Sequence, residues 1–282
     1  MYQLARPVLK HLGRVDLGGL VSDRAMRYAE ETEDPLLIAA ATWSLGQAMY
    51  ADDMPHGALH VAMTGAEKLR PLLPDGTPAH FAAYGGLQQV AAISAVRLED
   101  PWRARELLRG PAREAAATIG EGRNDVSIHL CHERRGDLYL HQAPLCVRDT
   151  SEWTRNDHHI VFGPTNVRIH MVHVEQQVGE ISDALRLADE VDITKIPSLE
   201  RKTTHLYELA RCYDYRNNDT AVFVHLKMAE RLCPQDFRYK HNVRSMVSTL
   251  GLSSAPSLPT PRRYGSSRHG SVCWTRSSRS TN

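Results

Sequence analysis

Two histidines one helical turn apart are the most direct candidate for chemistry in this sequence. The pattern is His170-x-x-His173-x-Glu175. Side chains three apart on a helix are neighbours, and neutral imidazole is a common ligand of Zn²⁺. The spacing places no third ligand beside them, and such pairs arise by chance in a chain with 15 histidines. We therefore expect no metal and no other cofactor, and a metalloprotein or enzyme built on these histidines is the least favoured alternative.

The other sequence patterns that indicate catalysis are missing. Residues 129–133 read HLCHE, which resembles a zinc-binding helix but lacks the HExxH spacing. Neither GxSxG nor a phosphate-binding GxxxxGK[ST] or GxGxxG loop occurs. The cysteines are odd in number and form no CxxC pair: Cys131, Cys146, Cys212, Cys233 and Cys273. This pattern predicts reduced thiols, some of them small core residues, in a protein that is not an enzyme.

A polar helical face after the Gly163-Pro164 turn is a better candidate for binding. Four residues at steps of four, three and four would share this face: Asn166, His170, His173 and Gln177. An Asn amide both donates and accepts hydrogen bonds, so it suits an extended peptide backbone. Thr165 or Asn166 can cap this helix, and the alternative is that Asn166 only caps it and that the histidines are surface residues.

A second polar ridge is expected on the helix that follows Ser198. It consists of Arg201, Thr204, His205, Glu208 and Arg211. Arg201 and Arg211 could hold a carboxylate or an acidic side chain between them. The alternative is a solvated helix face carrying Glu–Arg pairs.

Helices must position these faces, and apolar residues recur at helical spacing almost throughout the chain. The predicted helices cover residues 36–49, 55–69, 79–98, 101–119, 165–178, 182–191, 198–213, 220–232 and 235–250. Prolines in first turns and Ser182 as a helix N-cap support several starts. No alternating strand pattern is evident, so the predicted fold class is all-α.

The helices come in pairs, which suggests a repeat. Ala184 and Ala221 are 37 residues apart, as are Pro197 and Pro234. Tetratricopeptide (TPR) units have a period of about 34 residues and place small residues where their helices cross. The sequence thus predicts a TPR-like α-solenoid of antiparallel helix pairs, with an unrelated helix bundle as the alternative. In a solenoid both polar ridges would line a concave groove that binds a peptide, a small ligand or a protein.

The charge is unevenly distributed along the chain. After Gly251 there are five arginines and no acid, whereas the first 250 residues hold 29 basic and 33 acidic residues. Such a body does not predict specific DNA binding, because phosphate attraction needs clustered Lys and Arg. Residues 252–282 are rich in Ser, Pro and Arg without an apolar face, so we expect a disordered tail. No signal-peptide core or apolar run of 18 residues is present, which indicates a cytoplasmic protein without a membrane span.

Two blocks of sequence carry a family resemblance. They are FGPTNVRIH, residues 162–170, and PSLERKTTHLYELARCYD, residues 197–214; WSLG at 43–46 and GGLQ at 85–88 add to them. Together they resemble the C-terminal TPR-like region of actinobacterial helix-turn-helix transcriptional regulators of the XRE type. The resemblance covers roughly residues 16–251. It implies a region that senses a signal or mediates self-association beside an N-terminal DNA-binding domain.

The chain departs from that family in three places. Residues 1–15 are too short for a helix-turn-helix domain, and we expect a linker remnant there. The triplet Arg-Asn-Asp occurs at 123–125 and again at 155–157. In the family, the region before the FGPTN block resembles a single such triplet. Residues 126–154 are therefore predicted to be a poorly packed insertion in the 16–251 domain. The tail also differs from the family sequence, as expected if the end of the coding sequence is divergent or frameshifted.

These observations predict a ligand- or protein-binding regulatory module without its own helix-turn-helix. It would act as a homodimer or as a heterodimer with a full-length regulator. The alternative is a regulator that contacts DNA non-specifically through its basic tail or through a partner.

Overall fold

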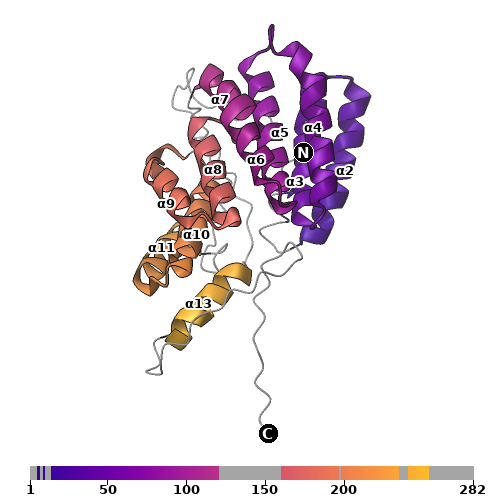
Figure 1. Cartoon of the computed structure of the whole chain (residues 1–282). Helices are drawn as coiled ribbons and strands as arrows, with labels where there is room; N and C mark the ends of the chain where they lie inside the picture. Colours follow the sequence, from indigo (N-terminus) through magenta and orange to yellow (C-terminus); the bar gives the residue numbers. More distant parts are fainter. Residues whose placement is uncertain are drawn as a thin grey trace, which may run out of the picture.

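The fold is helical in every part of the chain that the computed structural model describes. These parts are residues 5, 6, 9, 14–120, 160–196, 198–234 and 241–253, and they contain no strand (Figure 1). The predicted insertion at 126–154, the HLCHE segment, the tail from 254 and most of the 1–15 remnant lie outside the described residues. The predicted fold class is confirmed as all-α for the described chain. None of the described helices is both long and apolar enough to cross a membrane.

Two groups of helices follow one another along the chain. The first group comprises α2 (Val15–Thr32), α3 (Pro35–Ala51), α4 (Pro55–Leu69), α5 (Pro78–Arg97), α6 (Pro101–Leu107) and α7 (Arg113–Ile119). The second comprises α8 (Pro164–Val178), α9 (Ile181–Asp189), α10 (Leu199–Tyr215), α11 (Asp219–Leu232) and α13 (His241–Ser253). Short 3-10 turns lie at Arg70–Leu72 and Ile193–Lys195.

Local sequence explains most helix starts. Pro35, Pro55, Pro78, Pro101 and Pro164 each occupy the first helical position, where a missing N–H removes no hydrogen bond. The Asp34 carboxylate accepts from the Leu36 N–H at 2.8 Å and caps α3. The predicted cap at Ser182 is wrong. Helix α9 begins one residue earlier, at Ile181, and the Ser182 hydroxyl instead accepts from Arg216 Nη2 at 2.9 Å.

The predicted helix at 101–119 is interrupted in the structure. Residues Leu108–Ala112 form a wider π turn between α6 and α7. This turn contains Pro111, which has no N–H to donate and whose ring would clash with the carbonyl of Leu107 in a regular α-helix. The wider turn accommodates the proline while the chain continues in the same direction.

Helix α5 lies at the centre of the first group of helices. It contacts α3, α4, α6, α7 and α8, and its residues from 85 to 96 are all buried. A helix covered on all sides needs small or apolar residues around its whole circumference, and α5 has many alanines and two adjacent glycines. Beyond it, α8 contacts both α5 and α10, and α10 contacts α11. Helix α8 therefore joins the two groups, as Figure 1 shows.

Candidate functional site

A set of buried polar side chains lies on α5, α8 and α10, and α8 is hydrogen-bonded to each of the other two helices. We call it the polar cluster; its members are Gln88, Gln89, Asn166, His170, His173, His205 and Glu208. All are buried except His173, which is half-buried. Buried polar groups are costly unless they are hydrogen-bonded, so each needs an explanation.

Asn166 connects α8 to α5. Its Nδ2 donates to Gln89 Oε1 at 3.0 Å and to the Val161 carbonyl at 2.6 Å. Helix α8 starts at Pro164 behind Gly163, without a side-chain cap, so the alternative that Thr165 or Asn166 caps it is wrong. Pro164 takes the first helical position and thereby places Asn166 inside the first turn.

The two histidines of α8 have different partners. His173 Nδ1 donates to Glu208 Oε1 at 2.9 Å and so connects α8 to α10. His170 Nδ1 lies 2.8 Å from the Asn166 carbonyl, which can only accept, so Nδ1 carries the proton. Neither histidine is a plain surface residue.

The polar cluster has several buried atoms without a hydrogen-bond partner among the described residues. They are Gln88 Oε1, Gln89 Nε2, Asn166 Oδ1, His173 Nε2, His205 Nδ1 and Glu208 Oε2. The set includes a donor, acceptors and imidazole nitrogens that can take either role.

Arginines surround the polar cluster. Burial lowers the pKa of His170 well below its usual value, and the nearby positive charge of Arg201 lowers it further. Arg97 stacks on the Tyr50 ring at 4.2 Å and donates to the Tyr50 carbonyl at 2.7 Å. Burial raises the pKa of Tyr50, and the charges of Arg97, Glu208 and Arg211 also act on it. Groups from α3, α5 and α10 thus share one electrostatic environment.

Arg6 approaches the same region from the N-terminal segment. Its guanidinium lies 5.4 Å from the centre of the Trp43 ring. Burial lowers the pKa of Arg6; the field of Glu200 opposes this effect and that of Arg201 adds to it. Four arginines therefore lie around the cluster, and Arg201 and Arg211 form no ion pair with a described residue.

Glu175 does not join the histidines of its motif. Its carboxylate accepts two hydrogen bonds from Arg105 of α6, at 2.9 and 2.6 Å, while His173 pairs with Glu208. Within the described ranges, no group of three His, Cys, Asp or Glu residues is gathered to hold a metal ion. Cys212 is buried, and burial raises the pKa of its thiol to about 12, so it is a core residue and not a nucleophile.

The structure brings together some of the predicted site residues. Asn166, His170, His173 and His205 belong to the polar cluster, and the half-buried Arg201 and Arg211 lie near it. Gln177 is exposed, and its amide donates to Gln176 Oε1 at 2.9 Å, so the expected four-residue face ends at His173. Sequence reasoning missed Gln88 and Gln89, although two glutamines inside an otherwise apolar helix were a usable signal.

Comparisons with known proteins add no relative. No family model, curated protein or solved structure gives a significant match to the chain.

The buried histidine predicts a dependence of stability on pH. His170 is held neutral in the fold, whereas an unfolded histidine is protonated below a pKa of about 6.5. Its contribution is therefore fully present above that pH and is lost as the pH falls, by about 1.4 kcal/mol per pH unit for one proton. In urea unfolding at pH 7.5, 6.5 and 5.5, the free energy of unfolding should fall less with pH for His170→Gln than for wild type.

The exposed His60 gives the matched control for this measurement. His60→Gln should follow the wild-type pH dependence, because it leaves the buried His170 in place. If the free energy of unfolding depends on pH equally for His170→Gln and wild type, His170 is not held neutral in the fold.

Proposed function

We propose that this chain is a binding module that holds a peptide segment of a partner protein at the polar cluster. The observation that carries the proposal is the set of buried donors and acceptors on three helices that lack partners. A folded protein keeps such groups at a cost of about 1–3 kcal/mol each unless something satisfies them. A peptide backbone presents N–H and C=O groups in alternation, which matches the mixed character of the cluster.

The surrounding charges favour an acidic peptide. Arg201 and Arg211 are half-buried and have no acidic partner among the described residues, and Arg6 lies nearby. A carboxylate side chain would gain charge-assisted hydrogen bonds from these guanidinium groups. We therefore infer an extended peptide with at least one Asp or Glu.

The order of helix contacts is consistent with a TPR-like solenoid. Helices α3, α5, α8 and α10 contact one another in succession, as the inner helices of consecutive pairs would. In that arrangement the polar cluster belongs to the inner row. We propose accordingly that the chain acts as the sensory or self-association region of a regulator, as its resemblance to XRE-type proteins implies.

The test is selection from a phage-displayed library of random peptides, followed by anisotropy titration of the enriched peptides. Asn166→Ala and His173→Gln should each weaken binding about tenfold, because a buried hydrogen bond to a ligand is worth on the order of 1.4 kcal/mol. His173 is half-buried, so its variant tests the cluster even if Asn166→Ala lowers stability. Gln177→Ala removes an exposed amide from the same helix and should bind like wild type.

Two results would contradict this proposal. In one, the library yields no acidic peptide that binds. In the other, the enriched peptides bind both cluster variants with wild-type affinity, which would place their site elsewhere.

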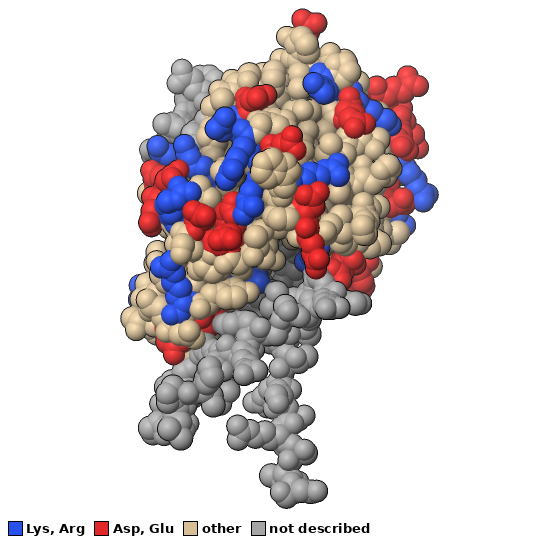
Figure 2. All heavy atoms as spheres, viewed as in Figure 1, with Lys and Arg blue, Asp and Glu red and all other residues tan. Residues whose placement is uncertain are grey.

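The second candidate function is non-specific DNA binding through the basic tail. Its basis is the sequence, with five arginines and no acid after Gly251. On the face shown in Figure 2, by contrast, Lys and Arg are interspersed with Asp and Glu over the described helices. A mobility-shift titration should then show weak, salt-sensitive binding that is lost when the chain ends at Gly251. Specific binding that survives truncation would reveal a DNA-binding surface in the helical body.

A further inference from the structure

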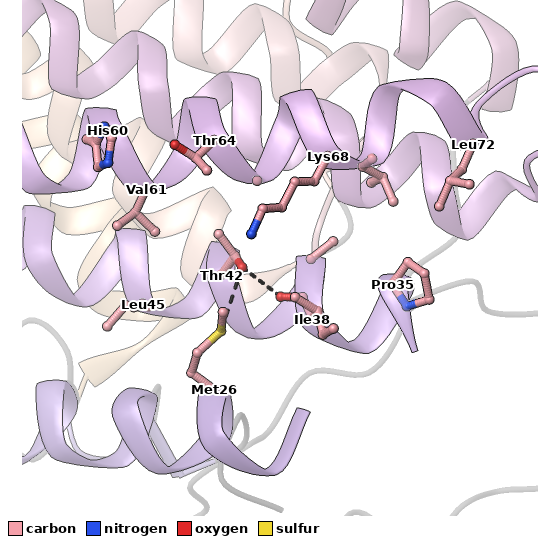
Figure 3. A pocket seen from close by; sticks show the side chains of 13 residues that line it. Met26, Pro35, Ile38, Thr42, Leu45, His60, Val61, Thr64, Lys68 and Leu72 are labelled. Atoms are coloured by element: carbon pink, nitrogen blue, oxygen red, sulfur yellow. Dashed lines mark hydrogen bonds between the residues drawn. The ribbon is translucent and has the colours of Figure 1, made fainter. Parts of the chain in front are cut away.

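A second candidate site, which shares no residue with the polar cluster, lies in a groove where α3 is flanked by α2 and α4. The groove has a volume of about 430 Å³. Such a volume is typical of small-molecule sites, which span roughly 300–1,000 Å³. Figure 3 shows side chains of all three helices directed toward it, with Met26 on α2, Ile38 and Thr42 on α3, and Val61 on α4.

The walls of the groove are largely apolar. Met26, Ile38, Leu45 and Val61 line it, and each is only half-buried. The hydroxyl of Thr42 is already engaged, because it donates to the Ile38 carbonyl at 2.7 Å and lies 3.7 Å from the Met26 sulfur. The floor therefore presents methyl and methylene groups, which favour an alkyl or ring system over a polar ligand.

Lys68 gives the groove its charge. Its side chain extends from α4 across the opening toward Thr42 (Figure 3). Among the described residues, no Asp or Glu lines the groove and none forms an ion pair with Lys68. The ammonium group is thus free to pair with an anionic group at one end of an apolar ligand.

The size of the groove favours a small ligand over a protein. The α4 lining runs from His60 to Leu69, a length of about 14 Å at a rise of about 1.5 Å per residue, and Leu72 of the following 3-10 turn extends it. A stable protein interface buries about 800 Å² on each partner and needs a broader surface. A narrow apolar groove with one cation at its edge suits a linear amphiphile.

The geometry points to a binding site for a medium-chain alkyl carboxylate between α2, α3 and α4, with the chain along the apolar wall and the carboxylate on Lys68. The site shares no residue with the polar cluster, so it is independent of the peptide proposal. Occupancy would join α2 and α4 through a shared ligand and so stabilise the first group of helices.

The test is calorimetric titration of the full chain with dodecanoate, below its micelle concentration, and with dodecanol. Saturable one-to-one binding of dodecanoate is expected. Lys68→Met should weaken dodecanoate binding about three- to fivefold, the range for a partly exposed ion pair, and leave dodecanol unaffected. Val61→Glu places a carboxylate at a half-exposed position beside the ligand and should weaken dodecanoate binding at least about tenfold.

Two control variants complete the design. Lys195→Met makes the same chemical change at an exposed lysine outside the groove and should bind dodecanoate like wild type. Asn166→Ala should also leave dodecanoate binding unchanged, which separates this site from the polar cluster. The inference fails if dodecanoate binding does not saturate, if Val61→Glu binds as tightly as wild type, or if Lys68→Met weakens both ligands equally.

Discussion

Replacing Gly85 by alanine is expected to lower the free energy of unfolding by about 2 kcal/mol, although it puts a better helix former into α5. Alanine in a helix interior is favoured over glycine by about 1 kcal/mol. At this position, however, a Cβ atom would overlap the ring of Phe162, which is buried against the helix. Overpacking of this kind costs about 1–3 kcal/mol, and more where a ring must leave its place. The clash therefore outweighs the gain in helix propensity, and urea unfolding at pH 7.5 would measure the difference.

A double-mutant cycle tests whether the Phe162 ring is the cause. In the Phe162→Ala background the clash is gone, so Gly85→Ala should now stabilise the protein by about 1 kcal/mol. The reversal of sign is the diagnostic result. Gly110→Ala is the matched control, because no atom of a described residue lies within 4 Å of the Cβ it would gain. Equal destabilisation by Gly85→Ala with and without Phe162 would locate the strain elsewhere.

Gly85 also illustrates how far the sequence determines the fold. Apolar spacing and first-turn prolines predict most helices of the described chain to within a few residues, because both signals are local. The pair of glycines inside a helix indicates a close contact. In the structure Gly85 packs against Phe162, which is 77 residues further along the chain. The spacing of residues could not identify Phe162 as the partner, since this contact depends on how α8 packs on α5.

Helix α2 was not among the helices singled out from the sequence. Its exposed face is crowded with charges such as Asp23, Arg24 and Arg27, and its apolar stripe is thin because Gly18, Ala25 and Ala29 do much of the packing. The contact with α3 stabilises it instead. Tertiary packing therefore stabilises α2 although its helical sequence pattern is weak.

The sequence predicts the types of residue in the candidate site better than it predicts their arrangement in the fold. The steps of four and three correctly grouped Asn166 with His170 and His173, because helical neighbours share a face. The same rule extended the face to Gln177, where α8 runs past its neighbours and the side chain reaches solvent. Gln89 and Glu208, which hold Asn166 and His173, lie on other helices, and only the packing of α5 and α10 brings them to α8.

The second large effect is expected from Arg105→Ala, which should lower the free energy of unfolding by about 3 kcal/mol. Glu175 is almost fully buried, with a side-chain exposure of 5%, and Arg105 binds both of its oxygens. The carboxylate raises the pKa of Arg105, as expected for a direct hydrogen-bonded pair. Removing one partner of such a pair leaves an uncompensated buried charge, at a cost of about 3–5 kcal/mol. The lower value is appropriate because Arg105 itself is 26% exposed.

Arg109 provides the comparison within the same site. It lies 3.8 Å from Glu175 and is 57% exposed, so Arg109→Ala should cost less than about 1 kcal/mol. Adding Glu175→Gln to Arg105→Ala removes the stranded charge and should recover more than half of the loss. If the double variant is as unstable as Arg105→Ala alone, the loss comes from the packing of the arginine side chain and not from the buried charge. Because this pair joins α6 to α8, recovery by the neutral variant would also show that the charge, and not the contact area alone, orders α8 beside the polar cluster.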